Sequence, residues 1–174
     1  TITIRGEFII SKELFAKHYS TTFKNARNFV AGLMNSKSVD PEVMKNIDFV
    51  AYEVVEPVLK PLDQFHLLES LDVNVVHHEH TDNISNEMLS KHLVDWRGSY
   101  GYIMDGVIVC HNKLYPRQEK NPEFAFAFKM VLSDQVAEVK IVDVLWAPSK
   151  DGYLKPRIRI EPVELGGVTI EYAT

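Results

Sequence analysis

The sequence predicts a mixed α+β fold that continues into a short all-β segment. Before about residue 100, apolar residues recur at helical spacing in several segments, with β-rich runs between them. After about residue 134, strand and turn signals follow one another without a helical pattern. With 174 residues, 45% of them hydrophobic, the chain can bury one core and a smaller second one. We therefore expect two domains, residues 1–133 and residues 134–174.

Composition and charge exclude several classes of protein. The hydrophobic content excludes a disordered or collagen-like chain. No apolar run approaches the roughly 20 residues that span a bilayer, and the first residues lack the basic start of a signal peptide. The single Cys110 cannot form an internal disulfide, which suits a reducing compartment. We expect a soluble cytoplasmic protein, and the Thr1 start suggests a piece of a longer one.

The charge is unevenly distributed along the chain. The net charge is −5, which argues against indiscriminate binding of polyanions. Residues 113–159 nevertheless hold nine basic and six acidic side chains, whereas residues 1–112 hold ten and fifteen. A nucleic-acid-binding face is therefore expected in the later part of the chain.

The first elements are predicted from alternation and a helix cap. Residues 2–10 alternate as a strand that places Arg5 and Glu7 on one face. Ser11 is typical of the N-cap of a helix, which we expect to end near Tyr19.

A second helix, a strand and a third helix follow. Apolar spacing predicts a buried helix over residues 25–35, whose N-terminal N–H groups could meet an anion beside Arg27. The continuous apolar run at 49–55 indicates a strand. Prolines then precede a helix at about 62–71.

The last part of the first domain is predicted to contain three strands and one helix. Residues 73–76 form a short β-rich run, and Ser85 can cap a helix that ends near Arg97. Residues 102–111 and 123–131 carry two further strand signals, the second strictly alternating.

The second domain is predicted to be all-β. Three strands are expected within residues 136–147, 153–163 and 168–174, as at the start of a small barrel or sandwich. The sequence Lys150-Asp151-Gly152 between the first two is read as a hairpin tip.

The strand at 123–131 holds a first candidate site residue. Its three phenylalanines share one face, which we expect to be core, while two alanines and Lys129 share the other. The small face could be a floor for a flat ligand, with Lys129 placed at its phosphate. The alternative is a half-exposed strand whose lysine is solvated, as most lysines are.

The pair Asp105-Gly106 is a second candidate. It places a carboxylate at a strand entry, where the glycine permits close approach of another backbone, and it could hold a divalent cation. The alternative is a type I′ hairpin turn, for which Asp-Gly is a common signal.

Two other features are not assigned a function. The histidines at 77, 78 and 80 alternate faces of an extended segment and lack a complementary second cluster, so we predict no metal site there. Cys110 is expected to be buried on its strand and inert.

Several stretches together have the order and spacing of motifs in one known family. They are Arg5-Gly6-Glu7, Asn25 to Gly32, Phe49 to Tyr52, Arg97 eight residues before Asp105, Phe124 to Lys129, and Lys155 to Thr169. In this respect the chain resembles the NAD-dependent DNA ligases. The resemblance implies a nucleotidyltransferase domain of ATP-grasp-like antiparallel sheets with flanking helices, here its C-terminal part at 1–133. It also implies the beginning of an OB-fold barrel at 134–174.

The resemblance also implies a reaction. A lysine attacks the α-phosphate of NAD, the AMP passes to a 5′-phosphate at a nick, and the 3′-hydroxyl displaces it. Positive charge and Mg²⁺ around the phosphates suit these steps. The implied catalytic residues are Arg27, Arg97 and Lys129.

Further roles follow from the same resemblance. Glu7 would accept from a ribose hydroxyl, Tyr52 would lie against the adenine, and Ile108 and Lys129 would also contact the cofactor. Asp105 would help to place Mg²⁺. The implied partners are nicked duplex DNA, NAD or AMP, and the rest of the ligase chain or a complementary subunit, in a bacterial or viral cytoplasm.

The chain departs from the family at three points. The nucleophilic lysine of the family lies in a Lys-x-Asp-Gly motif upstream of the Arg-Gly-Glu strand, and this sequence does not contain that motif. Cys110 stands where a lysine is expected, and Asn35 where an arginine is expected.

Two alternatives therefore stay open. The chain could be a non-catalytic subunit or degenerate DNA-binding fragment of a split ligase. It could also belong to a related RNA ligase or capping-type nucleotidyltransferase.

Overall fold

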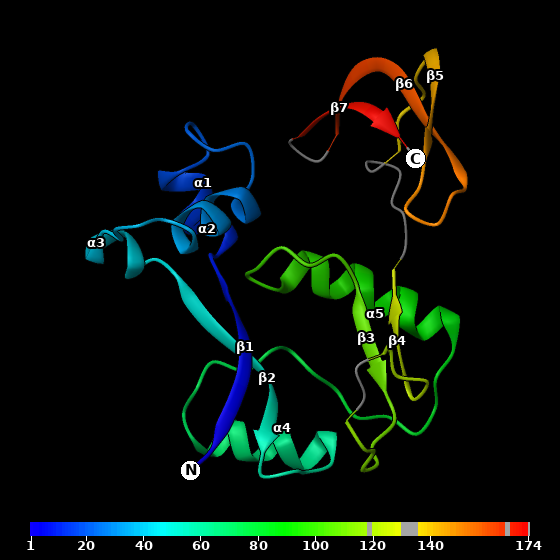
Figure 1. Ribbon diagram of the computed structural model, residues 1–174. Helices are drawn as coiled ribbons and strands as arrows, with labels where there is room; N and C mark the ends of the chain where they lie inside the picture. Colours follow the sequence, from blue (N-terminus) through cyan, green and yellow to red (C-terminus); the bar gives the residue numbers. More distant parts are fainter. Residues whose placement is uncertain (118–119, 130–135, 166–167, 174) are drawn as a thin grey trace. The chain divides into compact units, whose positions relative to one another are not determined.

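A computed structural model of the chain describes residues 1–117, 120–129, 136–165 and 168–173 (Figure 1). The chain divides into two compact units, Thr1–Met130 and Val131–Thr174. The predicted domain boundary at 133/134 lies outside the described residues.

The first unit begins with an antiparallel strand pair, as expected. Strand β1 (Thr3–Ile9) pairs with β2 (Asp48–Glu56). Arg5 lies opposite Glu53 and Gly6 opposite Ala51, so Tyr52 is left without a partner in the register. Such a bulge re-aims side chains locally and is frequent next to binding sites.

Helix α4 (Pro61–Ser70) packs against this strand pair (Figure 1). Ala51, Val54 and Leu68 form a buried cluster in which Leu68 is 0% exposed. The predicted helix at 62–71 is confirmed.

Replacing Leu68 tests how much this cluster contributes to the free energy of unfolding. Leu68→Ala removes a fully buried side chain and is expected to lower the free energy of unfolding by about 2–5 kcal/mol. Leu71→Ala is the control, because Leu71 is 40% exposed and surface changes usually stay within about 0.5 kcal/mol. Urea unfolding followed by circular dichroism measures both. Equal effects would show that the cluster does not hold α4 on the sheet.

Three capped helices pack at a second buried cluster, which is formed by Ile10, Ala26, Phe29 and Val30. They are α1 (Lys12–His18), α2 (Ala26–Met34) and α3 (Pro41–Met44), with the N-caps Ser11, Asn25 and Asp40. Phe29 on α2 is buried and stacks on Tyr19 at 4.1 Å between ring centroids. The first two helices are confirmed, whereas the short α3 was not predicted because four residues carry no periodicity.

Helix α5 (Asn86–Ser99) is also confirmed, with Ser85 as its N-cap and Leu89 and Leu93 buried. The predicted strand at 73–76 is wrong. Only Val75 forms a bridge, to Ala51 of β2.

The histidines that follow explain why no strand continues there. Their rings pack on helices. The ring centroid of His77 lies 4.5 Å from that of Trp96 in α5, and the ring of His78 stacks on that of Phe65 in α4 with 4.0 Å between the centroids. Ring contacts to two helices therefore hold the backbone at His77 and His78, which does not continue as a strand beside β2.

The second strand pair of the unit is shorter than predicted. Strand β3 (Val107–Cys110) pairs with β4 (Ala125–Phe128) in antiparallel register. The prediction that the phenylalanine face is core is wrong at Phe126, which is 52% exposed. A pair of four-residue strands is too narrow to bury one of its own faces. Of the predicted strand at 123–131, residues 130 and 131 lie outside the described residues.

Side-chain hydrogen bonds connect the segment before β3 to the first strand pair. The Tyr102 hydroxyl donates to Asp48 Oδ2 at 2.8 Å and accepts from Asn74 Nδ2 at 3.0 Å. Desolvation, and then the hydrogen bond to Asp48, raise the pKa of Tyr102, so its hydroxyl is a protonated donor at neutral pH.

The second unit is a three-stranded antiparallel sheet. Its strands β5 (Ile141–Pro148), β6 (Leu154–Leu165) and β7 (Val168–Ala173) pair in chain order. The hairpin tip at Lys150-Asp151-Gly152 is confirmed, and Gly152 has a φ of 82°, a conformation that favours glycine. These strands form an open sheet, so the OB fold stays a prediction.

Among the helices that the structure describes, none is both long and apolar enough to cross a bilayer.

Candidate functional site

Asp105 lies at the centre of the candidate site. Arg27, in the first turn of α2, places its Nη2 3.5 Å from Asp105 Oδ2. The two side chains are 85% and 62% exposed. An ion pair this exposed adds at most about 1 kcal/mol to stability. Both charged groups are therefore accessible to a ligand.

The second arginine reaches the same residue through the backbone. Arg97 lies in the last turn of α5, and its Nη2 donates to the Asp105 carbonyl at 2.9 Å, while Nε donates to the Met104 carbonyl at 3.4 Å. One arginine thus contacts the carboxylate of Asp105 and the other holds its peptide.

Lys129 is brought to this point by the strand register. Because Val107 pairs with Phe128, Lys129 comes opposite Gly106, directly beside Asp105. A Cβ at Gly106 would lie 2.6 Å from the Phe128 carbonyl oxygen and 2.8 Å from Cγ of Lys129. The glycine is therefore required by close approach of β4. The hairpin-turn alternative for Asp105-Gly106 is wrong, because β3 pairs with β4 and not with a strand immediately before it.

Ile108 shares a face of this strand pair with Lys129. It pairs with Ala127, and alternate residues of a strand point the same way. Ile108 is 70% exposed, and Ala127 and Lys129 on the same face are exposed as well, so the floor for a ligand and the solvated-strand alternative both stay open.

Cys110 also lies on this face, opposite Ala125, and the prediction that it is buried is wrong. The thiol is exposed because β3 and β4 are only a two-stranded pair. Partial desolvation by neighbouring atoms still raises its pKa, which keeps it in the less reactive thiol form at neutral pH.

Asn35, the other departure from the family pattern, is the C-cap residue of α2. Its Nδ2 donates to the Ala31 carbonyl at 2.8 Å. The amide thus has a structural role at the helix end.

Glu7 and Tyr52 lie on the first strand pair. Both are exposed, Glu7 opposite Val50 and Tyr52, 40% exposed, at the bulge. The described hydrogen bonds and ion pairs connect neither of them with Arg27 or Lys129. Thus the structure gathers Arg27, Arg97, Asp105 and Lys129, and leaves Glu7 and Tyr52 on a neighbouring sheet.

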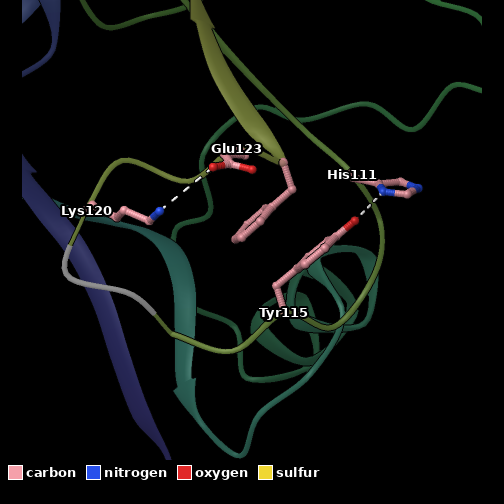
Figure 2. A pocket seen from close by; sticks show the side chains of 5 residues that line it. His111, Tyr115, Lys120 and Glu123 are labelled. Carbon is pink, nitrogen blue, oxygen red and sulfur yellow. Dashed lines mark hydrogen bonds and ion pairs between the residues drawn. The ribbon is translucent and has the colours of Figure 1, made fainter.

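A hollow at the opposite end of β3 and β4 was not predicted. This open depression has a volume of about 540 Å³ and is lined by His111, Tyr115, Lys120, Glu123 and Phe124. Figure 2 shows the side chains that line it. Tyr115 stacks on Phe124 at 3.9 Å, and its hydroxyl lies 2.6 Å from His111 Nδ1. None of these residues is a predicted site residue, and no sequence signal pointed to the hollow.

The second unit holds a row of cations within residues 113–159, whose positive charge led us to expect a nucleic-acid-binding face without naming this row. Lys155, Arg157 and Arg159 alternate along β6 and therefore share one face of the sheet. The Cζ atom of Arg157 lies over the ring of Tyr172, 4.1 Å from the ring centroid. The alternation of basic and apolar residues from 155 to 159 was the signal that could have found this row.

The contacts around Asp105 bring several charged groups together in the first unit. Two arginines, a lysine and a carboxylate surround the entry of one strand pair, next to a helix N-terminus whose N–H groups suit anions. Such a concentration of positive charge beside a single carboxylate is typical of domains that handle phosphates.

Comparison with known proteins identifies the family. A family model described as "NAD-dependent DNA ligase adenylation domain" matches residues 1–132. The chain belongs to this family.

Named relatives agree with this assignment. The DNA ligase of Acanthamoeba polyphaga mimivirus is 37% identical over 99% of this chain and 27% of its own length. The putative DNA ligase 052L of Invertebrate iridescent virus 3 is 35% identical over 99% of this chain and 24% of its own. The DNA ligase of Clostridium tetani is 28% identical over 99% of this chain and 28% of its own. The chain thus spans about a quarter of the length of these relatives.

Proposed function

We propose that this chain is the C-terminal part of the adenylation domain, followed by the start of an OB domain, of an NAD-dependent DNA ligase. The observation that carries the proposal is the meeting of Arg27 and Arg97 at Asp105, with Lys129 opposite Gly106, in a chain of this family. The protein would seal nicks through lysyl-AMP and DNA-adenylate intermediates.

The chemistry is two transfers of an adenylyl group, from NAD to a lysine and from the lysine to the 5′-phosphate, followed by formation of a phosphodiester bond with release of AMP. A lysine nitrogen bonds to the α-phosphorus of NAD as nicotinamide mononucleotide leaves. The 5′-phosphate at the nick then displaces the lysine, and the 3′-hydroxyl finally displaces AMP. Each step adds negative charge to a phosphate, which Arg27, Arg97 and Lys129 are proposed to stabilise.

Asp105 is the proposed ligand for Mg²⁺. Among the described residues no group of three or more His, Cys, Asp or Glu side chains could hold a metal on its own. Mg²⁺ is commonly bound through one or two carboxylates together with substrate phosphates and water, so an exposed carboxylate beside a phosphate site fits it. The ion would supply further neutralisation of phosphate charge.

The nucleotide itself would be bound by both strand pairs of the first unit. The exposed Tyr52 ring is proposed to lie against adenine, and Glu7 to accept from a ribose hydroxyl. Ile108 on the open floor would contact the nucleotide opposite these residues. A base stacked on an aromatic ring gains on the order of 1–3 kcal/mol.

The isolated 174-residue chain is expected to form no covalent adenylate. It contains no Lys-x-Asp-Gly motif to supply the nucleophile. Incubation with NAD labelled in its adenosine half, followed by denaturing electrophoresis, measures this. A stoichiometric, acid-labile adduct would overturn the assignment of the nucleophile to a segment outside this sequence.

The cation row of β6 is the proposed DNA-facing surface of the second unit. Three cations that neutralise about three phosphates contribute about −3 to the slope of log K against log salt. Replacing Lys155, Arg157 and Arg159 by glutamine should therefore make that slope shallower by about 3 for nicked duplex DNA. Lys150→Gln, at the hairpin tip outside the row, is the matched control. An unchanged slope in the triple variant would exclude the row from the DNA interface.

Nick sealing by the full-length protein tests the proposed function. We expect ligation of a nicked DNA duplex with NAD and Mg²⁺ and none with ATP. Sealing only after addition of a second polypeptide would favour the split-ligase alternative. Adenylation restricted to RNA ends would favour an RNA ligase.

A further inference from the structure

We infer that Lys12 is a positioning residue for the reaction, which acts by clamping the end of α5 that carries Arg97. This inference rests on the proposed function. The Lys12 ammonium donates to the Arg97 carbonyl at 2.7 Å and to the Tyr100 carbonyl at 2.8 Å. The Lys12 backbone N–H donates to the Gly101 carbonyl at 2.8 Å. Three hydrogen bonds from one residue thus hold the segment from Arg97 to Gly101.

The contacts match what a helix end needs. The last four carbonyls of an α-helix have no partner within the helix, and they form the negative end of its dipole. Tyr100 N–H closes the final turn on the Trp96 carbonyl, which leaves the Arg97 carbonyl for another donor. The partly buried ammonium of Lys12 supplies that donor, with a charge that the dipole favours.

The position of Lys12 in its own helix strengthens the inference. Lys12 is the first residue of α1, directly after the Ser11 N-cap. A cation at a helix N-terminus is unfavourable to that helix. The charge of Lys12 therefore destabilises α1 itself, and the contacts of its ammonium with α5 explain why a lysine stands at this position.

The clamp connects to the reacting groups through Arg97. Arg97 is held by its carbonyl at Lys12, and its guanidinium extends to the Met104 and Asp105 carbonyls. Asp105 in turn meets Arg27. The Lys12 ammonium has its contacts on backbone carbonyls of the α5 end, so it would act on the phosphates only through Arg97.

A double-mutant cycle on nick sealing by the full-length protein tests this inference. Lys12→Met keeps most of the length of the side chain and removes its charge and donors. We expect it to lower the single-turnover sealing rate about 10-fold, since a misplacement of about 1 Å can cost up to about 100-fold. In an Arg97→Met background the same change should lower the rate by less than about 2-fold, because coupled residues are not additive. Lys12→Gln, which keeps an uncharged NH2 donor group, replaces Lys12→Met if that variant does not fold.

The outcomes separate the inference from the proposed function. Lys17→Met, on the exposed last turn of α1, is the control and should leave the rate unchanged in both backgrounds. Equal losses from the Lys12 change in both backgrounds would overturn the positioning role while the ligase assignment stands. A wild-type protein that seals no nick would overturn the proposed function itself. Melting temperatures measured for every variant show that the rates were compared between folded proteins.

Discussion

Lys129→Met in the full-length protein is expected to lower the rate of nick sealing about 10²- to 10³-fold, the usual effect of losing one fixed donor to a developing charge. Lys129 is exposed, and the strand register places it opposite Gly106, the residue next to Asp105, where Arg27 and Arg97 meet. Methionine keeps much of the side-chain length and apolar stem, so strand β4 should keep its register. Single-turnover sealing of a nicked duplex under saturating NAD and Mg²⁺ measures the effect.

The matched control is Lys113→Met. Lys113 is an exposed lysine that follows β3, at the end of the strand pair away from Asp105. We expect its replacement to change the rate by less than about 2-fold, as for surface changes far from the site. If both variants lower the sealing rate equally, the loss comes from the change in net charge of the protein, and Lys129 does not stabilise the reacting phosphate.

Gly106→Ala is expected to cost about 1–3 kcal/mol of stability, as overpacking usually does, together with most of the sealing activity. The new Cβ would meet the Phe128 carbonyl at 2.6 Å and Lys129 Cγ at 2.8 Å. The carbonyl belongs to the backbone of β4 and cannot move without breaking the pairing with β3. The change therefore strains the register that places Lys129 beside Asp105.

Gly98→Ala provides the comparison. Nothing lies within 4 Å of a Cβ built at Gly98, which is near the end of α5. Alanine is favoured over glycine within a helix by up to about 1 kcal/mol, so this variant should be as stable as wild type or slightly more so. Thermal unfolding and sealing rates, measured for both glycine variants, test whether the close approach of β4 requires a glycine at position 106. A stable and active Gly106→Ala protein would mean that β4 does not approach Asp105 this closely.

The elements of the first unit could be predicted where local chemistry decides them. Ser11, Asn25 and Ser85 each accept a hydrogen bond from a backbone N–H of the helix that they begin. The β-rich run at 73–76 forms an isolated bridge from Val75 to Ala51 of β2, and the rings of His77 and His78, which follow it, pack on two different helices. Ring packing between distant segments leaves no periodic signal in a sequence.

The same limit applies to the strand pair that carries the site. Strict alternation located β4, but it could not show that β3 is its one partner among the strands that the structure describes. As a result Phe126 and Cys110 were expected to be buried and are exposed. Burial depends on how many layers cover a strand, which its own sequence does not record.

The candidate site was predicted through family motifs more than through spacing. Arg27 and Asp105 are far apart in sequence, yet their side chains meet in an ion pair. The carbonyls that bind the Arg97 guanidinium and the Lys12 ammonium belong to the backbone, so no residue type marks them. The joint role of Glu7 and Tyr52 with these groups stays a prediction.

A crystal structure of the full-length protein with AMP bound tests the central claim most directly. We expect the adenine ring to lie against Tyr52 and the phosphate to lie within about 3 Å of a nitrogen of Arg27, Arg97 or Lys129. AMP bound instead in the hollow between Tyr115 and Lys120, with those three cations turned toward solvent, would contradict it.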